Sequence, residues 1–446
     1  MTTEIDFIGG NTKRCLMAMA LPMIAAMFLN MMYNLVDSLW IGNLLGETAY
    51  AALTNATPII LILTSVAMGA TNGVSILLSQ AIGAKDKNRT ESLIATSFCV
   101  AVVFSVLVTV VLELFLPGIL KALNTPAETC DMAYSYLSIY VSGYLAIYLY
   151  CYFAAVLRSF GNSMFQAAAM LTTTILNAVL DPVFIHFIGF NGAAIATLLS
   201  EAICLLFMLV YLKKKKLFTF RISGFDKSDI FPLIQKAIPS VIQQSIPAIS
   251  TTFLTALVST YSVTAIAAYG VTGKLETILF YPAMALNMVL TTIIGQCIGG
   301  GRYDRAKDYL KCALGYGCCL LMLLSALVVG FSKQLSGLFI KSSDVAGIVG
   351  TYFLIVSAGY VLNTVTNCCL GALNGMGKPS KSMFLMIFYY IVVRMPLACL
   401  LSFCGFGLNG IWIAVLVSHV VACAAASISG TVSFKKPGRH SRLTMT

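Results

Sequence analysis

The chain has 446 residues, of which 59% are hydrophobic and only 10% are charged, and its mean hydropathy is +0.89. Soluble domains carry about a quarter charged residues, so this composition excludes an ordinary soluble protein and predicts one with many membrane spans. The net charge of +11 does not indicate a nucleic-acid partner, because the basic residues fall in short loops between apolar runs.

Apolar segments of about spanning length follow one another along the whole chain. They cover residues 15–42, 49–79, 91–115, 131–156, 165–187 and 191–212, then 237–260, 264–297, 307–331, 347–371, 382–403 and 408–430. We therefore expect an all-α membrane protein of twelve transmembrane helices. The first apolar run has full spanning length and no small-residue cleavage site after it, so we expect no signal peptide.

The first of these spans contains one acid, Asp37, and one proline, Pro22. A carboxylate in hydrocarbon costs several kcal/mol on most scales, so an acid at this depth indicates a functional site. The alternative is that Asp37 reaches water near the helix end before Gly42. Pro22 is either a plain kink or a hinge whose bend depends on the charge of Asp37.

The fifth span carries an amide and an acid four residues apart, Asn177 and Asp181. This spacing puts both side chains on one helix face. Pro182 has no N–H and crowds the carbonyl of Ala178, which leaves that oxygen free. The cluster predicts an oxygen-rich site for a proton or a small cation. The alternative is that Asp181 lies at a water-exposed end of the helix, since it is about two turns before Gly189.

Other polar residues in the spans are weaker candidates. The tyrosines could equally serve in an aromatic belt or in packing, and Lys274 and Glu276 lie two residues apart and so do not share a helix face. Arg394 precedes Pro396 and needs a partner, as Glu201 does. The residues that could line a cavity are Asn34, Tyr136, Tyr140, Thr197, Gln243, Glu276 and Arg394.

Lysine and arginine give the expected orientation. Of the 28 such residues, all but five lie in loops on the side that holds the N-terminus; the exceptions are Lys121, Lys333 and Lys341 on the opposite side and Lys274 and Arg394 within spans. By the positive-inside rule, both termini face the cytoplasm and the protein resides in the cell (inner) membrane.

The two halves of the sequence repeat. The segment 48–52 (TAYAA) aligns with 264–268 (TAIAA), and 80–83 (QAIG) aligns with 296–299 (QCIG). After a two-residue insertion, Asn191-Gly192 meets Asn409-Gly410. We expect an N-lobe at 1–216, a basic cytoplasmic linker at 217–236 and a C-lobe at 237–446, with six spans in each lobe and a pseudo-two-fold axis along the membrane normal. Such repeats place the substrate path at or within the lobes.

The two halves differ in their acidic residues at aligned positions. The residue that aligns with Asp37 is Phe253, and the residue that aligns with Asp181 is Leu397. A purely structural acid would more naturally recur in both halves, so the asymmetry favours a functional role for Asp37 and Asp181.

Signatures of enzymes are absent from the sequence. It contains no Walker A, GxSxG or HExxH motif, its 14 cysteines form no CxxC framework, and none of its three histidines has a Cys or carboxylate at ligand spacing. We expect no catalytic residues, no metal site and no cofactor.

Several of these residues resemble a known family. The segment Tyr33…Asp37…Gly42, the turns at 80–83 and 296–299, Asn177…Asp181-Pro182, and Arg394-Met-Pro396 followed by Gly410-Ile-Trp412 are similar to multidrug and toxic compound extrusion (MATE) transporters, and most similar to their DinF-like branch. The resemblance implies export of organic, often cationic, compounds in exchange for H+ or Na+, with the coupling ion at Asp37, Asn177 and Asp181. The seventh-span glutamate of the NorM-like branch has no match in segment 239–247.

Three other functions remain as alternatives. A flippase of lipid-linked saccharides would need several cavity arginines, and only Arg394 is clearly within a span; a membrane-embedded enzyme would need a convergent catalytic set; a channel would need a pore ring. We expect small organic substrates, membrane lipids as neighbours, no nucleic-acid partner and a monomer.

Overall fold

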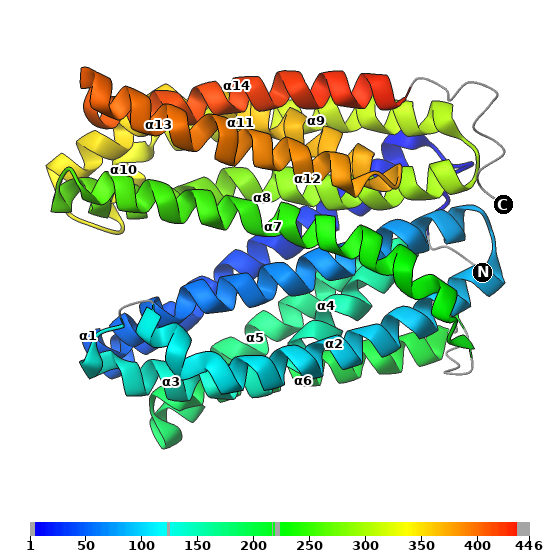
Figure 1. Ribbon diagram of the computed structural model, residues 1–446, viewed down its shortest axis with the longest axis horizontal. Helices are drawn as coiled ribbons and strands as arrows, with labels where there is room; N and C mark the ends of the chain where they lie inside the picture. Colours follow the sequence, from blue (N-terminus) through cyan, green and yellow to red (C-terminus); the bar gives the residue numbers. More distant parts are fainter. Residues whose placement is uncertain (1–4, 123–124, 216, 219–223, 435–446) are drawn as a thin grey trace. The chain divides into compact units, whose positions relative to one another are not determined.

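The computed structural model describes residues 5–122, 125–215, 217–218 and 224–434, and this part of the chain is entirely helical apart from its turns (Figure 1). The helices of the first half are α1 (Thr12–Gly83), α2 (Lys87–Ala122), α3 (Ala127–Ser142), α4 (Tyr144–Ser159), α5 (Ser163–Ile188) and α6 (Phe190–Lys215). The later ones are η2 (Lys227–Asp229), α7 (Ile230–Ser259), α8 (Val263–Gly299), α9 (Tyr303–Gly330), α10 (Ser332–Gly337), α11 (Ser343–Gly375), α12 (Pro379–Ile387), η3 (Phe388–Arg394), α13 (Met395–Leu401), η4 (Ser402–Phe406) and α14 (Gly407–Ser433).

The chain divides into two compact units. The first contains Met17–Ala248, and the second contains everything from Ile249 onward together with Phe7–Leu16. Two helices therefore change unit along their length: α1 near its start and α7 near its end. Each unit has its own hydrophobic core, built around residues such as Tyr144 and Leu157 in the first unit and Tyr352 and Val415 in the second.

The predicted membrane spans all lie in helices. Ten helices of the described chain are long and apolar enough to cross a membrane, or eleven when the pair Glu128–Ser142 and Tyr144–Ser159 counts as one span bent by 50°. The longest of the ten, Pro379–Ser433, covers the last two predicted spans. Two glycines with positive φ, Gly405 (93°) and Gly407 (55°), break the helical path between those two spans.

Glycine also separates the first two spans. Gly46 has φ of 80° and ψ of −167°, which interrupts α1 between the helical stretches Thr12–Leu45 and Thr48–Gly83. Glycine adopts such a conformation without the steric penalty that a Cβ imposes. At Pro22, by contrast, α1 continues as a helix.

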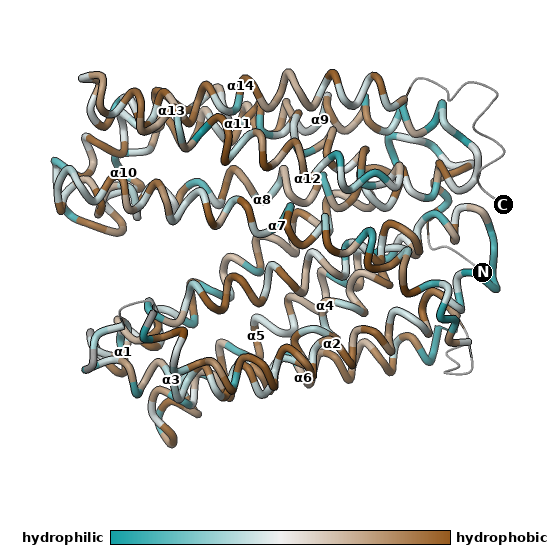
Figure 2. The backbone as a smooth tube through the Cα atoms, in the orientation of Figure 1, coloured by the Kyte–Doolittle hydropathy of each residue, from teal (hydrophilic) through white to brown (hydrophobic). Residues whose placement is uncertain are grey.

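Part of the helical surface is suited to lipid. On α2, Val103, Leu107 and Leu114 are 66%, 57% and 72% exposed, and Figure 2 shows this helix as largely hydrophobic in its middle. A contiguous apolar face of this kind is unfavourable in water, whereas lipid chains cover it without cost.

The sequence repeat corresponds to matching turns in the two halves. At the ends of α1 and α8, Lys85 (φ 58°) and Gly301 (φ 71°) occupy the same left-handed position. Their N–H groups donate to Ile82 O (2.9 Å) and Ile298 O (3.0 Å). The same correspondence holds for two further pairs with positive φ, Gly161 with Gly377 and Gly189 with Gly407.

The described part of the linker is held by α2. Asp229 is fully buried, forms an ion pair with Arg89 and accepts a hydrogen bond from Ser92 Oγ (2.7 Å). The exposed Asp226 caps the short helix η2, and hydrogen bonds from Ser228 hold its pKa below the usual value. The predicted linker residues 219–223, Lys216 and the C-terminal residues 435–446 lie outside the described chain.

The segment Phe7–Leu16 belongs to the second unit. Phe7 is fully buried, and its ring meets the Tyr309 ring edge-on at a centroid distance of 6.4 Å. Its carbonyl oxygen accepts hydrogen bonds from Arg305 Nε (3.0 Å) and Tyr309 Oη (3.1 Å). These contacts fix the segment before α1 against α9.

Candidate functional site

The predicted amide–acid pair lies in the interior of the first unit. Asn177 and Asp181 on α5 are both 0% exposed, and Asn177 Nδ2 donates to Asp181 Oδ1 at 2.9 Å. This hydrogen bond spans one helical turn, as the spacing of four residues requires. The alternative of a water-exposed helix end is therefore wrong for Asp181.

The helix α1 brings the second acid to this pair. Asp37 is half-buried, and its carboxyl group lies within hydrogen-bonding distance of the Asp181 carboxyl group. Asp37 Oδ1, Asp181 Oδ2 and Asn177 Oδ1 are buried and accept no hydrogen bond from any described protein group. Ionised carboxylates are acceptors only, so two of them can approach this closely only when a proton or a cation lies between them.

Two of the predicted tyrosines surround these acids. Tyr136 and Tyr140 on α3 are buried, and both interact electrostatically with Asp37. Tyr136 also interacts with Asp181, and its ring stacks at an angle against Phe190 with centroids 5.0 Å apart.

The described contacts of the other predicted residues do not include the Asp37 or Asp181 carboxyl group. Thr197 is buried on α6 and interacts with Tyr33. Gln243 is buried on α7, and Asn34 is exposed with its amide bonded to Asn30 O (2.8 Å) in its own helix. Pro22 lies about 22 Å along α1 from Asp37, at 1.5 Å per residue.

A third carboxyl group, Glu201, belongs to the same region of the first unit. Its Oε2 is buried and has no described hydrogen-bond partner. It interacts electrostatically with Tyr33 and Tyr140, which also interact with Asp37. The only feature of the sequence that marked Glu201 as a candidate site residue was its charge within the sixth predicted span.

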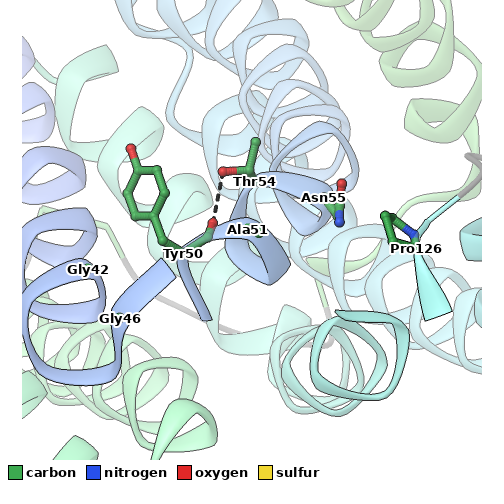
Figure 3. A pocket seen from close by; sticks show the side chains of 7 residues that line it. All are labelled: Gly42, Gly46, Tyr50, Ala51, Thr54, Asn55 and Pro126. Carbon is green, nitrogen blue, oxygen red and sulfur yellow. Dashed lines mark hydrogen bonds between the residues drawn. The ribbon is translucent and has the colours of Figure 1, made fainter. Parts of the chain in front are cut away.

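A surface cavity of about 560 Å³ opens in the first unit near the break in α1. It is lined by Gly42, Gly46, Tyr50, Ala51, Thr54, Asn55 and Pro126 (Figure 3). Its lining contains no charged side chain, and Thr54 Oγ1 donates to Tyr50 O at 2.9 Å. The acids Asp37 and Asp181 do not line it, so this cavity is separate from the acid cluster.

Glu276 and Arg394 do not join the acid cluster. Both belong to the second unit, on α8 and η3, where they interact electrostatically with one another.

The helical bundle and the buried carboxyl cluster are those of a membrane transporter. Comparison with known families gives a specific result: the MatE family model matches residues 22–183 and 239–400, once in each half. The chain thus belongs to the multidrug and toxic compound extrusion family. It is a multi-pass membrane protein of the multidrug efflux type and not an enzyme, which weighs against the flippase, enzyme and channel alternatives.

Curated relatives cover nearly the whole chain. The probable multidrug resistance protein YpnP of Bacillus subtilis is 28% identical over 425 residues, covering 94% of this chain and 95% of the relative. The probable multidrug resistance protein YoeA of the same organism is 25% identical, with 88% of each chain covered. The FAD transporter of Shewanella oneidensis is 26% identical, with 92% and 93% covered.

Solved structures share the fold. An outward-facing multidrug resistance MATE family transporter superposes with a TM-score of 0.92 at 23% identity, covering 97% of this chain and 98% of that one. A MOP superfamily transporter from Pyrococcus furiosus gives a TM-score of 0.92 at 22% identity, with the same coverage.

Proposed function

We propose that this protein exports organic, often cationic, compounds in exchange for an ion that binds at Asp37, Asn177 and Asp181. The observation that carries the proposal is the pair of facing carboxyl groups, with buried oxygens that lack a protein donor. In the proposed topology both termini lie in the cytoplasm of a cell whose inner membrane holds the protein. The asymmetric acids of the first half support assignment to the DinF-like branch.

We infer that the coupling ion is a proton. One proton between the Asp37 and Asp181 carboxyl groups would supply the missing donor and remove the repulsion between two charged carboxylates. Ion binding biases transport only if affinity for the ion differs between two states of the protein. Pro22 is the proposed hinge in α1 that responds to the charge of Asp37.

The test uses purified protein in sealed vesicles loaded with a fluorescent organic cation. A proton gradient and a sodium gradient are imposed separately, and the dye is followed. We expect movement with the proton gradient, and we expect Asp37→Asn to abolish it without loss of expression. The matched control is Asp304→Asn, an exposed acid on α9 in the second unit.

Dye movement with sodium alone would replace the proton by Na+ as the coupling ion. Full export by Asp37→Asn would contradict the site assignment. If neither gradient moves any of several unrelated dyes, the antiporter proposal fails, and a lipid-linked saccharide becomes the next substrate to measure.

A further inference from the structure

The surface cavity near the break in α1 takes no part in the proposed ion site. Its volume of about 560 Å³ lies within the roughly 300–1,000 Å³ that is typical of small-molecule sites. It lies where Gly46, with φ of 80°, turns the chain between the stretches Thr12–Leu45 and Thr48–Gly83. In the proposed topology this turn is on the side of the membrane opposite the cytoplasm, so a ligand reaches the cavity from outside the cell.

One wall of the cavity is an aromatic ring. Tyr50 is 40% exposed, and its Cδ2 atom would lie 3.4 Å from a Cβ placed on Gly42, so the ring packs against this glycine. Figure 3 shows the Tyr50 ring on one side of the lining, with Asn55 and Pro126 on the other. The face of an aromatic ring carries a negative electrostatic potential and attracts cations. This wall therefore favours a positively charged ligand.

The opposite wall presents an amide oxygen that accepts no hydrogen bond. Asn55 Nδ2 donates to Thr129 Oγ1 at 3.0 Å, and Thr129 Oγ1 donates to Pro126 O at 3.2 Å. Because the Thr129 proton is used in the bond to Pro126, this hydroxyl can only accept from Asn55, which fixes the end of the amide that faces it. Asn55 Oδ1 is left without a donor among the described residues, so it is available to a ligand that donates.

The rest of the lining offers little to an anion. Thr54 Oγ1 already donates to Tyr50 O at 2.9 Å, so only its lone pairs remain for a ligand. Among the described residues that line the cavity there is no lysine, arginine or histidine. One helical stretch ends and the next begins beside Gly46, and the partial charges of these two helix ends are opposite in sign and largely cancel. The side chains therefore decide the preference, and they favour a cation that donates hydrogen bonds.

We propose that this cavity binds organic ammonium ions, with the ligand nitrogen donating to Asn55 Oδ1 and the positive charge facing the Tyr50 ring. An ammonium group has N–H donors and no acceptor, which matches a lining whose unused side-chain atoms mainly accept. Asp37 and Asp181 do not line the cavity, so this site is distinct from the proposed ion site. That the cavity receives exported compounds rests on the proposed function; that it binds ammonium ions does not.

The test compares three probes that share an indole ring and differ in charge: tryptamine (cation), tryptophol (neutral) and indole-3-propionate (anion). Binding to the purified full-length protein in lipid nanodiscs is measured by calorimetry with no ion gradient, and empty nanodiscs give the blank. We expect tryptamine to bind at least about fivefold more tightly than tryptophol, and indole-3-propionate to bind most weakly. Equal affinities, a reversed order or no saturable binding of tryptamine would overturn the proposal.

Two variants locate the bound cation in this cavity. Tyr50→Leu removes the ring and should weaken tryptamine binding about threefold. Asn55→Asp exchanges the amide for a carboxylate of the same shape, and should strengthen tryptamine binding while weakening that of indole-3-propionate. The matched control is Tyr134→Leu, which removes an exposed tyrosine on α3 outside the lining and should leave all three affinities unchanged. Unchanged tryptamine affinity in both Tyr50→Leu and Asn55→Asp refutes the site.

A third variant separates this site from the proposed antiport. Asp37→Asn should keep the affinity for tryptamine while abolishing export driven by the proton gradient. Loss of tryptamine binding in Asp37→Asn, with normal binding in Tyr50→Leu, would place the bound cation at the acid cluster and overturn the proposal. Absence of gradient-driven export from a protein that still binds tryptamine in the expected order would contradict the proposed function alone.

Discussion

At the residue scale, the buried oxygens around Asp37 and Asp181 define what the first unit can bind. The only hydrogen bond that the described protein donates to Asp181 comes from Asn177, at 2.9 Å. A buried carboxyl group depends strongly on such a donor, because no water replaces it. We therefore expect Asn177 to hold Asp181 in position within the proposed ion site.

Replacing Asn177 tests this role. Asn177→Leu keeps the branched shape of the side chain but removes the donor, and a hydrogen bond to a charged group contributes about 1.5–3 kcal/mol. We expect proton-driven dye export at a fixed gradient to fall roughly tenfold or more, by the relation of 1.4 kcal/mol to a factor of ten. The measurement is the initial rate of dye movement in vesicles.

The control for this prediction lies on the same helix. Thr172 is half-buried, and its hydroxyl donates to Ala168 O, in its own helix, at 2.9 Å. Thr172→Val should leave the export rate unchanged. Equal loss in both variants would assign the effect to general damage of α5 and contradict the positioning role.

Some of these site residues could be predicted from the sequence alone. The spacing of Asn177 and Asp181 predicted a shared helix face, and the family resemblance placed Asp37 with them. The interaction of Glu201 with Tyr33 and Tyr140 could not be predicted, because it depends on how α6 packs. His419 was also missed, because its contact with Arg394 Nη2 (3.3 Å) joins two different helices and does not follow from spacing along the chain.

At the element scale, close helix packing explains why the two halves keep the same glycines. A Cβ at Gly192 would lie 2.2 Å from Phe184 O, and one at Gly410 would lie 2.8 Å from Leu401 O. Real Cβ atoms do not approach backbone so closely, so in both halves this glycine sets the distance between consecutive spans. The sequence predicted the repeat of Asn-Gly but not this steric cause.

A substitution at this position should be destabilising. Gly192→Ala forces α5 and α6 apart, and overpacking of this kind costs about 1–3 kcal/mol. We expect a clear drop in the apparent melting temperature of the detergent-solubilised protein. Gly118→Ala on α2 meets nothing within 4 Å and should be neutral or slightly stabilising. A melting temperature for Gly192→Ala equal to that of Gly118→Ala would contradict the packing argument.

The sequence predicted where the spans lie but not where they bend, because bends depend on tertiary contacts. Hydropathy located every span, because apolar length is a local property. The bend of 50° at Gly143 was not predicted. Gly143 packs closely against Leu198 of α6, whose side chain would lie 2.3 Å from a Cβ at that position. Such breaks arise from neighbours distant in sequence, which a hydropathy pattern does not contain.

At the scale of the whole molecule, the charge distribution predicts orientation. Nearly all lysines and arginines lie in loops on one side, which favours retention of that side in the cytoplasm. We expect a green fluorescent protein fused after Thr446 to fluoresce in intact cells, and alkaline phosphatase fused at the same point to be inactive. The opposite pair of results would invert the proposed topology.

Because Phe7–Leu16 folds as part of the second unit, its contacts form late during biosynthesis. Arg305 and Tyr309, which bind the Phe7 carbonyl, are made about 300 residues later, which takes roughly 15–60 s at 5–20 residues per second. During that time the spans of the first unit are already inserting, while Phe7–Leu16 still lacks its contacts with α9. This segment therefore reaches its folded position after most of the first unit has been made.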